Sequence, residues 1–261
     1  MKTLILKELN AIEALEDVRI VCACESGSRA WGAFSGNSEY DVRFIYLHRQ
    51  QWYLSRQPGR DVIELAIKHG LDISGWDLRK ALRLFGHSSP ALLEWLQSPL
   101  VYREIPEIMS QLRALVPTVY ARERAWHYYF HGVRRFRQRY VGGEYSLKLF
   151  FRVLRFLLAA MWIREQAAPP PMTLQDLADV LLPPGLHQEM RRLLQQKGAG
   201  SEMNVAVVGP LWDFVEVELG RLTAAQPHFH RTWPPMDQMN IIFRRFLQIA
   251  WQTEQRQYNM R

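Results

Sequence analysis

The chain has 261 residues, enough for one large domain or two small ones, and 48% of them are hydrophobic against 23% charged. Such a composition is typical of a globular protein and excludes a largely disordered chain. Lys and Arg number 33 against 26 Asp and Glu, which gives a formal net charge of +7. This balance favours acidic partners such as nucleic acid, nucleotides or an anionic membrane surface.

The sequence carries no signal for secretion or membrane insertion. Cys22 and Cys24 lie in one apolar run, and alternation along a strand would place them on the same face, where a bridge is disfavoured. Residues 1–10 contain Lys7 and Glu8 where a signal peptide needs an apolar core. The longest wholly apolar run, 156–163, is too short to cross a membrane. We therefore expect a cytoplasmic protein with reduced cysteines and no membrane partner.

The first part of the chain alternates between helix and strand patterns. In chain order, the expected elements are an amphipathic helix over 2–16, strands over 18–24 and 39–47, and a third β segment within 61–73 that is interrupted near Gly70. A turn-rich segment rich in Gly and Ser separates the first two strands. Ser74 with Asp77 three residues later matches a capping box, and Ser89-Pro90 places proline at the first position of a helix.

Beyond residue 100 the sequence favours helices almost throughout. They are expected near 105–115, 118–140, 145–166, 173–182, 186–197, 204–223 and 236–255. We therefore predict an α+β fold with two domains. Residues 1–100 would form a small mixed sheet with flanking helices, and residues 101–261 an all-helical domain.

Two carboxylates in the second predicted strand suggest a metal site. Glu39 and Asp41 are two residues apart, so on a strand they point to the same side. Two adjacent anions are costly without a cation between them, and Mg²⁺ takes oxygen ligands together with phosphates. A third carboxylate from a neighbouring strand would complete the site. Asp72 is the first candidate for it, and Asp61 and Asp77 are weaker ones.

A second feature lies between the first two strands. Ser26-Gly27-Ser28 follows the first strand directly, and glycine with exposed N–H groups can cradle a phosphate. Arg29 follows and could neutralise a triphosphate. Each piece alone is common in proteins without such a function. Their order is more specific: a strand, a Gly-Ser turn, a short helix, and then two acids on the next strand.

These residues resemble the predicted nucleotidyltransferases of the DNA polymerase beta superfamily that are associated with RNA repair. The resemblance covers roughly residues 18–165. The segments that carry it are 25–32 (ESGSRAWG), 38–46 (SEYDVRFIY), 71–80 (LDISGWDLRK), 93–102 (LEWLQSPLVY) and 148–163.

The resemblance implies transfer of a nucleoside monophosphate from a nucleoside triphosphate to an acceptor hydroxyl, on RNA, with release of pyrophosphate. Gly27 and Ser28 would form the triphosphate-binding turn. Glu39 and Asp41 would hold Mg²⁺ or Mn²⁺, with Asp72 as the third acid. Glu39 departs from the family, which usually has aspartate there. A catalytically degenerate module that binds nucleotide or RNA is therefore an alternative, and an enzyme that modifies a protein hydroxyl is another.

Basic residues supply further candidates. Lys148, Arg152 and Arg155 share one face of a predicted helix, which either faces the nucleotide and RNA or is a solvated face opposite the core. Arg43 shares a strand face with Asp41, so it either stabilises phosphates or forms a structural ion pair. The complete set of predicted nucleotide-binding residues is Gly27, Ser28, Arg29, Ser38, Arg43, Lys80, Lys148, Arg152 and Arg155.

Overall fold

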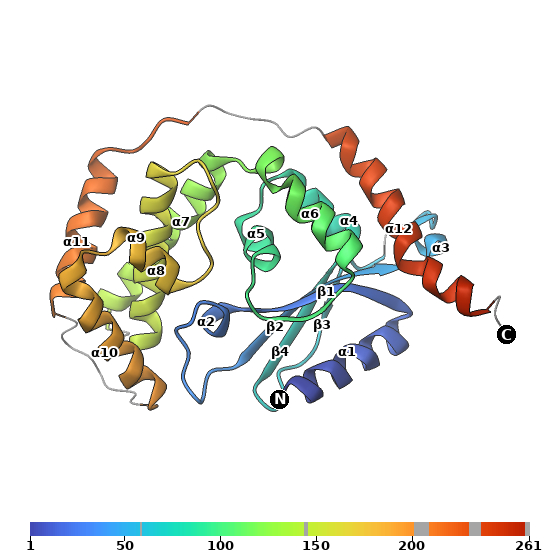
Figure 1. Cartoon of the computed structure of the whole chain (residues 1–261), viewed down its shortest axis with the longest axis horizontal. Coiled ribbons are helices and arrows are strands. Elements are labelled where there is room, and N and C mark those ends of the chain that lie inside the picture. Colours follow the sequence, from blue (N-terminus) through green and yellow to red (C-terminus); the bar gives the residue numbers. More distant parts are fainter. Residues whose placement is uncertain (58, 144–145, 201–208, 230–235, 259–261) are drawn as a thin grey trace. The chain divides into compact units, whose positions relative to one another are not determined.

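The computed structural model describes residues 1–57, 59–143, 146–200, 209–229 and 236–258 (Figure 1). Contacts divide the chain into two compact units. We call them the sheet unit (Met1–Ser26, Glu39–Val119 and Trp233–Arg261) and the helical unit (Gly27–Ser38 and Tyr120–Thr232). These bounds differ from 1–100 and 101–261, and the catalytic and substrate-binding roles of the two expected domains stay predictions.

The sheet unit contains a mixed sheet of five strands in the order β3-β4-β2-β1-β5. Its strands are β1 (Val18–Ser26), β2 (Tyr40–His48), β3 (Val62–Glu64), β4 (Leu71–Asp77) and β5 (Val101–Glu104). β2 pairs with β1 in an antiparallel ladder and with β4 in a parallel one. β2 is therefore the central strand, and Asp41 near its start lies in the middle of the sheet.

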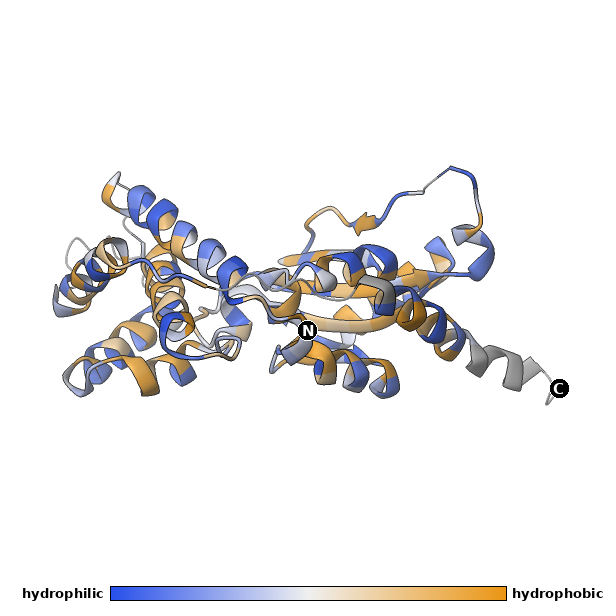
Figure 2. Cartoon of the chain, turned by 90° about the horizontal axis from the view of Figure 1, so that it is seen from above, coloured by the Kyte–Doolittle hydropathy of each residue, from blue (hydrophilic) through white to orange (hydrophobic). Residues whose placement is uncertain are grey.

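Helices cover both faces of this sheet (Figure 1). The helices of the sheet unit are α1 (Lys2–Glu16), α3 (Gln50–Tyr53), α4 (Leu78–Gly86), α5 (Pro90–Leu96), α6 (Pro106–Val119) and α12 (Met236–Tyr258). α1 lies on one face, and α4, α5 and α6 lie on the other. Figure 2 shows hydrophobic strands between helices whose outer faces are hydrophilic, as expected for a layered α+β fold. The predicted fold class is confirmed.

Alternation along β2 decides which side chains face α1. Val42, Phe44 and Tyr46 are buried in one apolar cluster with Ile5 and Leu9 of α1. Because successive side chains of a strand point to opposite faces, Asp41 and Arg43 point to the other side, toward the α4–α6 layer. The same rule applies to β4, where Leu71 and Ile73 join the α1 cluster and Asp72 points away from it.

The C-terminal helix α12 packs within the sheet unit. The indole N–H of Trp251 donates to the backbone oxygen of His48 at 3.1 Å, and the guanidinium of Arg49 lies 4.3 Å from the Trp251 ring centre. Phe243 meets Tyr53 edge to face, with ring centres 4.9 Å apart. A helix far along the chain thus covers the end of β2 and α3.

The helical unit is built around α8 (Leu147–Glu165), which is buried on nearly all sides. Around it lie α7 (Arg122–Val141), α9 (Leu174–Leu181), a 3₁₀ turn (Pro184–Leu186), α10 (His187–Gly198) and α11 (Gly209–Ala224). The short helix α2 (Gly27–Ala30) and the loop after it belong to this unit, because Ala30, Trp31 and Ala33 are part of its hydrophobic core. Among the described residues, no helix is long and apolar enough to cross a membrane.

One helix start was predicted wrongly. Ser74 is not an N-cap but lies inside β4, and the strand continues to Asp77. Asp77 itself caps α4, since its carboxylate accepts a hydrogen bond of 2.8 Å from the backbone N–H of Arg79. The prediction of a helix start at Ser89-Pro90 is confirmed, with Ser89 as N-cap of α5.

Candidate functional site

Two of the predicted acids lie side by side in the sheet. Asp41 and Asp72 are partners in the parallel ladder of β2 and β4, and both point away from α1. The Nη2 atom of Arg43 lies 2.6 Å from Asp72 Oδ2 and 3.6 Å from Asp41 Oδ1. The side chains are 28%, 28% and 19% exposed for Asp41, Asp72 and Arg43, so a ligand can reach them. The guanidinium of Arg43 shows that this place accepts a cation between the two carboxylates.

The structural ion pair considered for Arg43 is thus present, and Arg43 also donates to the backbone oxygen of Asp72 at 3.0 Å. Its role toward phosphates stays a prediction. The guanidinium supplies one positive charge between the two carboxylates, where a divalent ion would supply two, and it contacts both of them. Carboxylate oxygens from two adjacent strands are the donors that Mg²⁺ and Mn²⁺ prefer. Asp41 and Asp72 therefore fit such an ion.

Glu39 does not join this pair. It is exposed and lies one residue before β2, outside the ladder that orients Asp41. Among the described residues, no three His, Cys, Asp or Glu side chains gather as a ready metal site. The pairing of β2 with β4 begins at Tyr40, so it does not bring Glu39 to Asp41 and Asp72. The role of Glu39 as a metal ligand stays a prediction.

A buried carboxylate that the sequence analysis did not single out supports Asp41. Glu25 of β1 is 0% exposed and pairs with Val42, on the face that packs against α1. Its Oε1 accepts the backbone N–H of Asp41 at 2.8 Å, and its Oε2 accepts the hydroxyl of Tyr102. The carboxylate thus fixes the backbone at Asp41 from the opposite face of the sheet. A charged residue at the end of an otherwise apolar strand was the available sequence signal.

The Gly-Ser turn is part of the helical unit. Gly27 has a φ of 71°, in the left-handed region that favours glycine. The backbone N–H of Ala33 donates to the oxygen of Ser28 at 2.9 Å. Arg29 donates to the backbone oxygen of Ser38 at 2.7 Å, and its guanidinium lies 5.1 Å from the Phe34 ring centre. Both predicted ligands, Arg29 and Ser38, therefore brace the loop 31–38.

The other basic candidates differ in environment. Lys80 pairs with Asp61 at 3.2 Å, so Asp61 serves as its partner. Lys148 is exposed, and the guanidinium of Arg152 lies 5.8 Å from the Trp31 ring centre. Arg155 is only 1% exposed, lies 4.6 Å from the same ring centre and donates to the oxygen of Met172 at 3.0 Å. From Lys148 to Arg155, this face of α8 thus runs from solvent into the core, and the nucleotide-binding roles of its three basic residues stay predictions.

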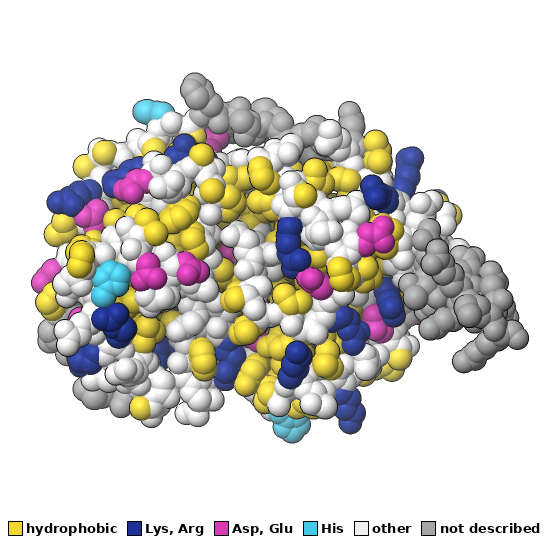
Figure 3. Space-filling view, viewed as in Figure 1, with side chains coloured by type: hydrophobic (Ala, Val, Ile, Leu, Met, Phe, Trp, Pro, Cys, Tyr) yellow, Lys and Arg dark blue, Asp and Glu magenta, His cyan; other side chains and the backbone are white. Residues whose placement is uncertain are grey.

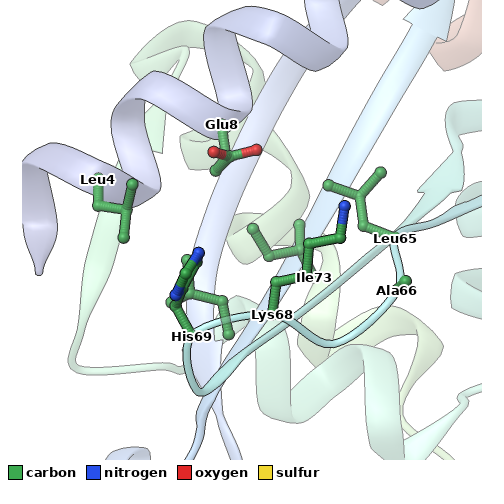
Figure 4. A pocket seen from close by; sticks show the side chains of 8 residues that line it. Leu4, Glu8, Leu65, Ala66, Lys68, His69 and Ile73 are labelled. Atoms are coloured by element: carbon green, nitrogen blue, oxygen red, sulfur yellow. The ribbon is translucent and has the colours of Figure 1, made fainter.

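A cavity of the sheet unit lies away from the Asp41–Asp72 pair. A cavity of about 290 Å³ lies between α1 and the turn that joins β3 and β4, lined by residues that include Glu8, Lys68 and Ile73 (Figure 4). Ile73 belongs to the α1 cluster, so this cavity is on the opposite face of the sheet from Asp72.

On the face seen in Figure 3, basic and acidic side chains are interspersed, so the net positive charge forms no continuous basic patch there.

A family model described as the RNA repair pathway DNA polymerase beta family matches residues 1–245. The chain belongs to this family. It is also 44% identical over 228 residues to the uncharacterized protein YcgL of Bacillus subtilis (strain 168), with 86% of this chain and 88% of that protein covered.

A solved structure, a nucleotidyltransferase-like protein from Exiguobacterium sibiricum 255-15, is 14% identical and covers 85% of this chain and 75% of that one, with a TM-score of 0.35. At that TM-score it adds nothing to the family assignment. The family and the fold indicate a polymerase-β-like nucleotidyltransferase, and the Asp41–Asp72 pair belongs to this fold.

The contacts of Arg43 with Asp41 and Asp72 should stabilise the fold when no divalent cation is bound. Without divalent cations, Arg43→Met should lower the free energy of unfolding by about 1–3 kcal/mol, because Asp41 and Asp72 lose their shared counter-charge. Millimolar Mg²⁺ should restore more stability to this variant than it adds to the wild type. Denaturant unfolding with EDTA and with Mg²⁺ measures both effects. Arg19→Met, which removes a more exposed arginine of β1 that pairs with Glu13, is the control. Equal responses of both variants to Mg²⁺ would contradict the prediction.

Proposed function

We propose that the protein is a metal-dependent nucleotidyltransferase. It transfers a nucleoside monophosphate from a nucleoside triphosphate to an acceptor hydroxyl on RNA and releases pyrophosphate. The observation that carries this proposal is the pairing of Asp41 with Asp72 on one face of the sheet, around a single cationic group, in a chain of the polymerase beta family.

The reaction forms one bond and breaks one. The oxygen of the acceptor hydroxyl attacks the α-phosphorus, the bond from this phosphorus to the oxygen bridging to the β-phosphate breaks, and pyrophosphate leaves. The hydroxyl proton needs an acceptor, and Asp72 Oδ2, which is half-buried and accepts a hydrogen bond from Arg43, can take it. In such a transfer, positioning and charge neutralisation supply most of the acceleration.

Mg²⁺ or Mn²⁺, held by Asp41 and Asp72 with Glu39 as the third ligand, would polarise the acceptor hydroxyl and neutralise charge on the leaving pyrophosphate. Arg43, which contacts both carboxylates, would change partners when they bind the metal, and its guanidinium would then bind a phosphate oxygen. Glu25 keeps Asp41 in place throughout, since it holds the backbone and not the carboxylate.

The phosphate side of the site is proposed from the chain itself. Ser26 is the β1 residue paired with Asp41, and Gly27 and Ser28 follow it directly in sequence. Gly27 has a left-handed backbone and, as a glycine, no Cβ that could obstruct an approaching phosphate. Gly27 and Ser28 are therefore the proposed turn for the triphosphate.

The test is an assay with each of four labelled nucleoside triphosphates, a mixed RNA pool, and Mg²⁺ or Mn²⁺. Labelled RNA and pyrophosphate should form with the wild type, should require the metal, and should be lost with Asp41→Ala. If the wild type and Asp41→Ala give the same products, the catalytic proposal is wrong. If label appears on protein in a treated cell extract and never on RNA, the acceptor is a protein hydroxyl.

A second function, a non-catalytic module that binds nucleotide, is favoured by one observation. Glu39 is longer than aspartate and lies outside the Asp41–Asp72 pair in this structure. Binding of nucleotide that requires Mg²⁺, with no pyrophosphate released from any of the four nucleotides, would support this function over transfer.

A further inference from the structure

A buried lysine of the helical unit, Lys197, has no role in the proposed reaction. Lys197 lies in the last turn of α10 and is 7% exposed. Its Nζ atom donates to the backbone oxygen of Ala33. Ala33 is the residue whose N–H binds the oxygen of Ser28, so Lys197 is tied to the loop that follows the Gly-Ser turn.

Lys197 is buried near two other cations. Burial and the nearby charges of Lys148 and Arg152 lower the pKa of Lys197 from its ordinary value to about 8. α10 packs against α8, which carries both of these residues. Within the described part of the chain, Lys197 forms no ion pair with a carboxylate, and its hydrogen-bond acceptor is the neutral Ala33 carbonyl.

This arrangement is costly for a purely structural lysine. Removing an ammonium group from water is unfavourable, and neighbouring cations add to the cost. A neutral amide side chain could bind the Ala33 oxygen without either penalty. A bound anion would offset both the burial and the repulsion, because three cations of the same unit would then share its charge.

We propose that Lys197, Lys148 and Arg152 form an anion site that binds the polyphosphate tail of a nucleoside triphosphate. The identity of this ligand rests on the proposed function. Lys148 is exposed and lies one turn before Arg152 on α8, so an anion from solvent can reach it. Lys197 is nearly buried, which suits a compact terminal phosphate better than the continuous backbone of RNA. The Trp31 and Phe136 rings, 5.8 and 5.1 Å from the Arg152 guanidinium, hold that residue in place.

The experiment measures binding of inorganic tripolyphosphate to the full chain by calorimetry, without metal or acceptor. Lys197→Met and Lys148→Met should each weaken the affinity about tenfold, while Arg192→Met should leave it unchanged. Arg192 is a suitable control because it lies on the same helix and pairs with Glu189. Lys148 is exposed, so its variant decides the matter even if Lys197→Met does not fold.

A structural role of Lys197 alone would not produce a dependence on pH. The protonated amine binds the anion, so the wild-type affinity should fall as the pH rises from one unit below to one unit above the Lys197 pKa of about 8. Lys197→Met should not show this fall. Among the residues that the structure describes, the groups that face the amine are Lys148 and Arg152 from α8 and the Ala33 carbonyl from the loop.

Three results would overturn the proposal. One is equal affinity of the wild type, Lys148→Met and Lys197→Met for tripolyphosphate. The second is the same pH dependence in the wild type and Lys197→Met. The third is a loss of affinity confined to an RNA oligonucleotide. Transfer activity with unchanged tripolyphosphate binding in the variants would refute only this site, whereas binding as expected with no transfer would refute only the proposed function.

Discussion

Asp72→Asn is expected to lower the rate of nucleotide transfer by about a thousandfold. Asparagine has nearly the same shape, and its side-chain oxygen can still accept the hydrogen bond from Arg43. It has no negative charge, however, so it neither attracts a divalent cation nor accepts the proton of the acceptor hydroxyl. Because Asp72 and Arg43 are partly exposed, the free energy of unfolding should change by no more than about 1 kcal/mol.

The measurement is the initial rate of transfer at saturating nucleotide, together with a denaturation curve for each protein. Asp17→Asn makes the same chemical change at an exposed site, the left-handed C-cap of α1, where asparagine is well tolerated. Its activity should equal that of the wild type. A variant at Asp72 that keeps most of the wild-type rate would remove Asp72 from the catalytic machinery.

Glu25→Ala is expected to lower the free energy of unfolding by about 2–4 kcal/mol. The substitution leaves the N–H of Asp41 and the hydroxyl of Tyr102 without their carboxylate partner inside the sheet unit. It also opens space in a region that is otherwise packed against α1. Since the start of β2 is no longer held, the transfer rate should fall as well, although Glu25 does not touch the substrate.

Chemical denaturation of Glu25→Ala beside Glu16→Ala checks this expectation. Glu16 is exposed at the end of α1, so its variant should stay within about 0.5 kcal/mol of the wild type. Glu25→Gln should be intermediate, because its amide oxygen can accept the N–H of Asp41 while its other end cannot accept the Tyr102 hydroxyl. Equal stability of Glu25→Ala and the wild type would show that the buried carboxylate does not support Asp41.

The strands β1 and β2 and most helices could be predicted because their signals are local, whereas β5 was missed in a region where the sequence favours helices. The apolar run of β1, the alternation in β2 and the breaks between the later helices lie within short windows of sequence. Ser74 was placed wrongly for a physical reason: the capping-box pattern is local, but β4 continues through it because pairing with β2 and β3 favours the strand. Tertiary pairing outweighed the local preference.

The candidate site could be predicted in part. Asp41 and Asp72 were both singled out, but only the parallel register of β2 and β4 makes them partners, and a register between strands about 30 residues apart is not a local signal. Glu25 and Lys197 were missed because their importance comes from burial next to residues far along the chain. A carboxylate in an apolar strand was a weak signal for Glu25, and we find none for Lys197.

The central claim is that Asp41 and Asp72 together hold a divalent cation. Crystals grown with a non-hydrolysable nucleoside triphosphate and Mn²⁺ would test it through the anomalous signal of the metal. We predict an anomalous peak about 2–2.3 Å from an oxygen of each carboxylate, with the Arg43 guanidinium moved away from that position. Bound nucleotide with Mn²⁺ elsewhere, and Arg43 still between the two aspartates, would contradict the account.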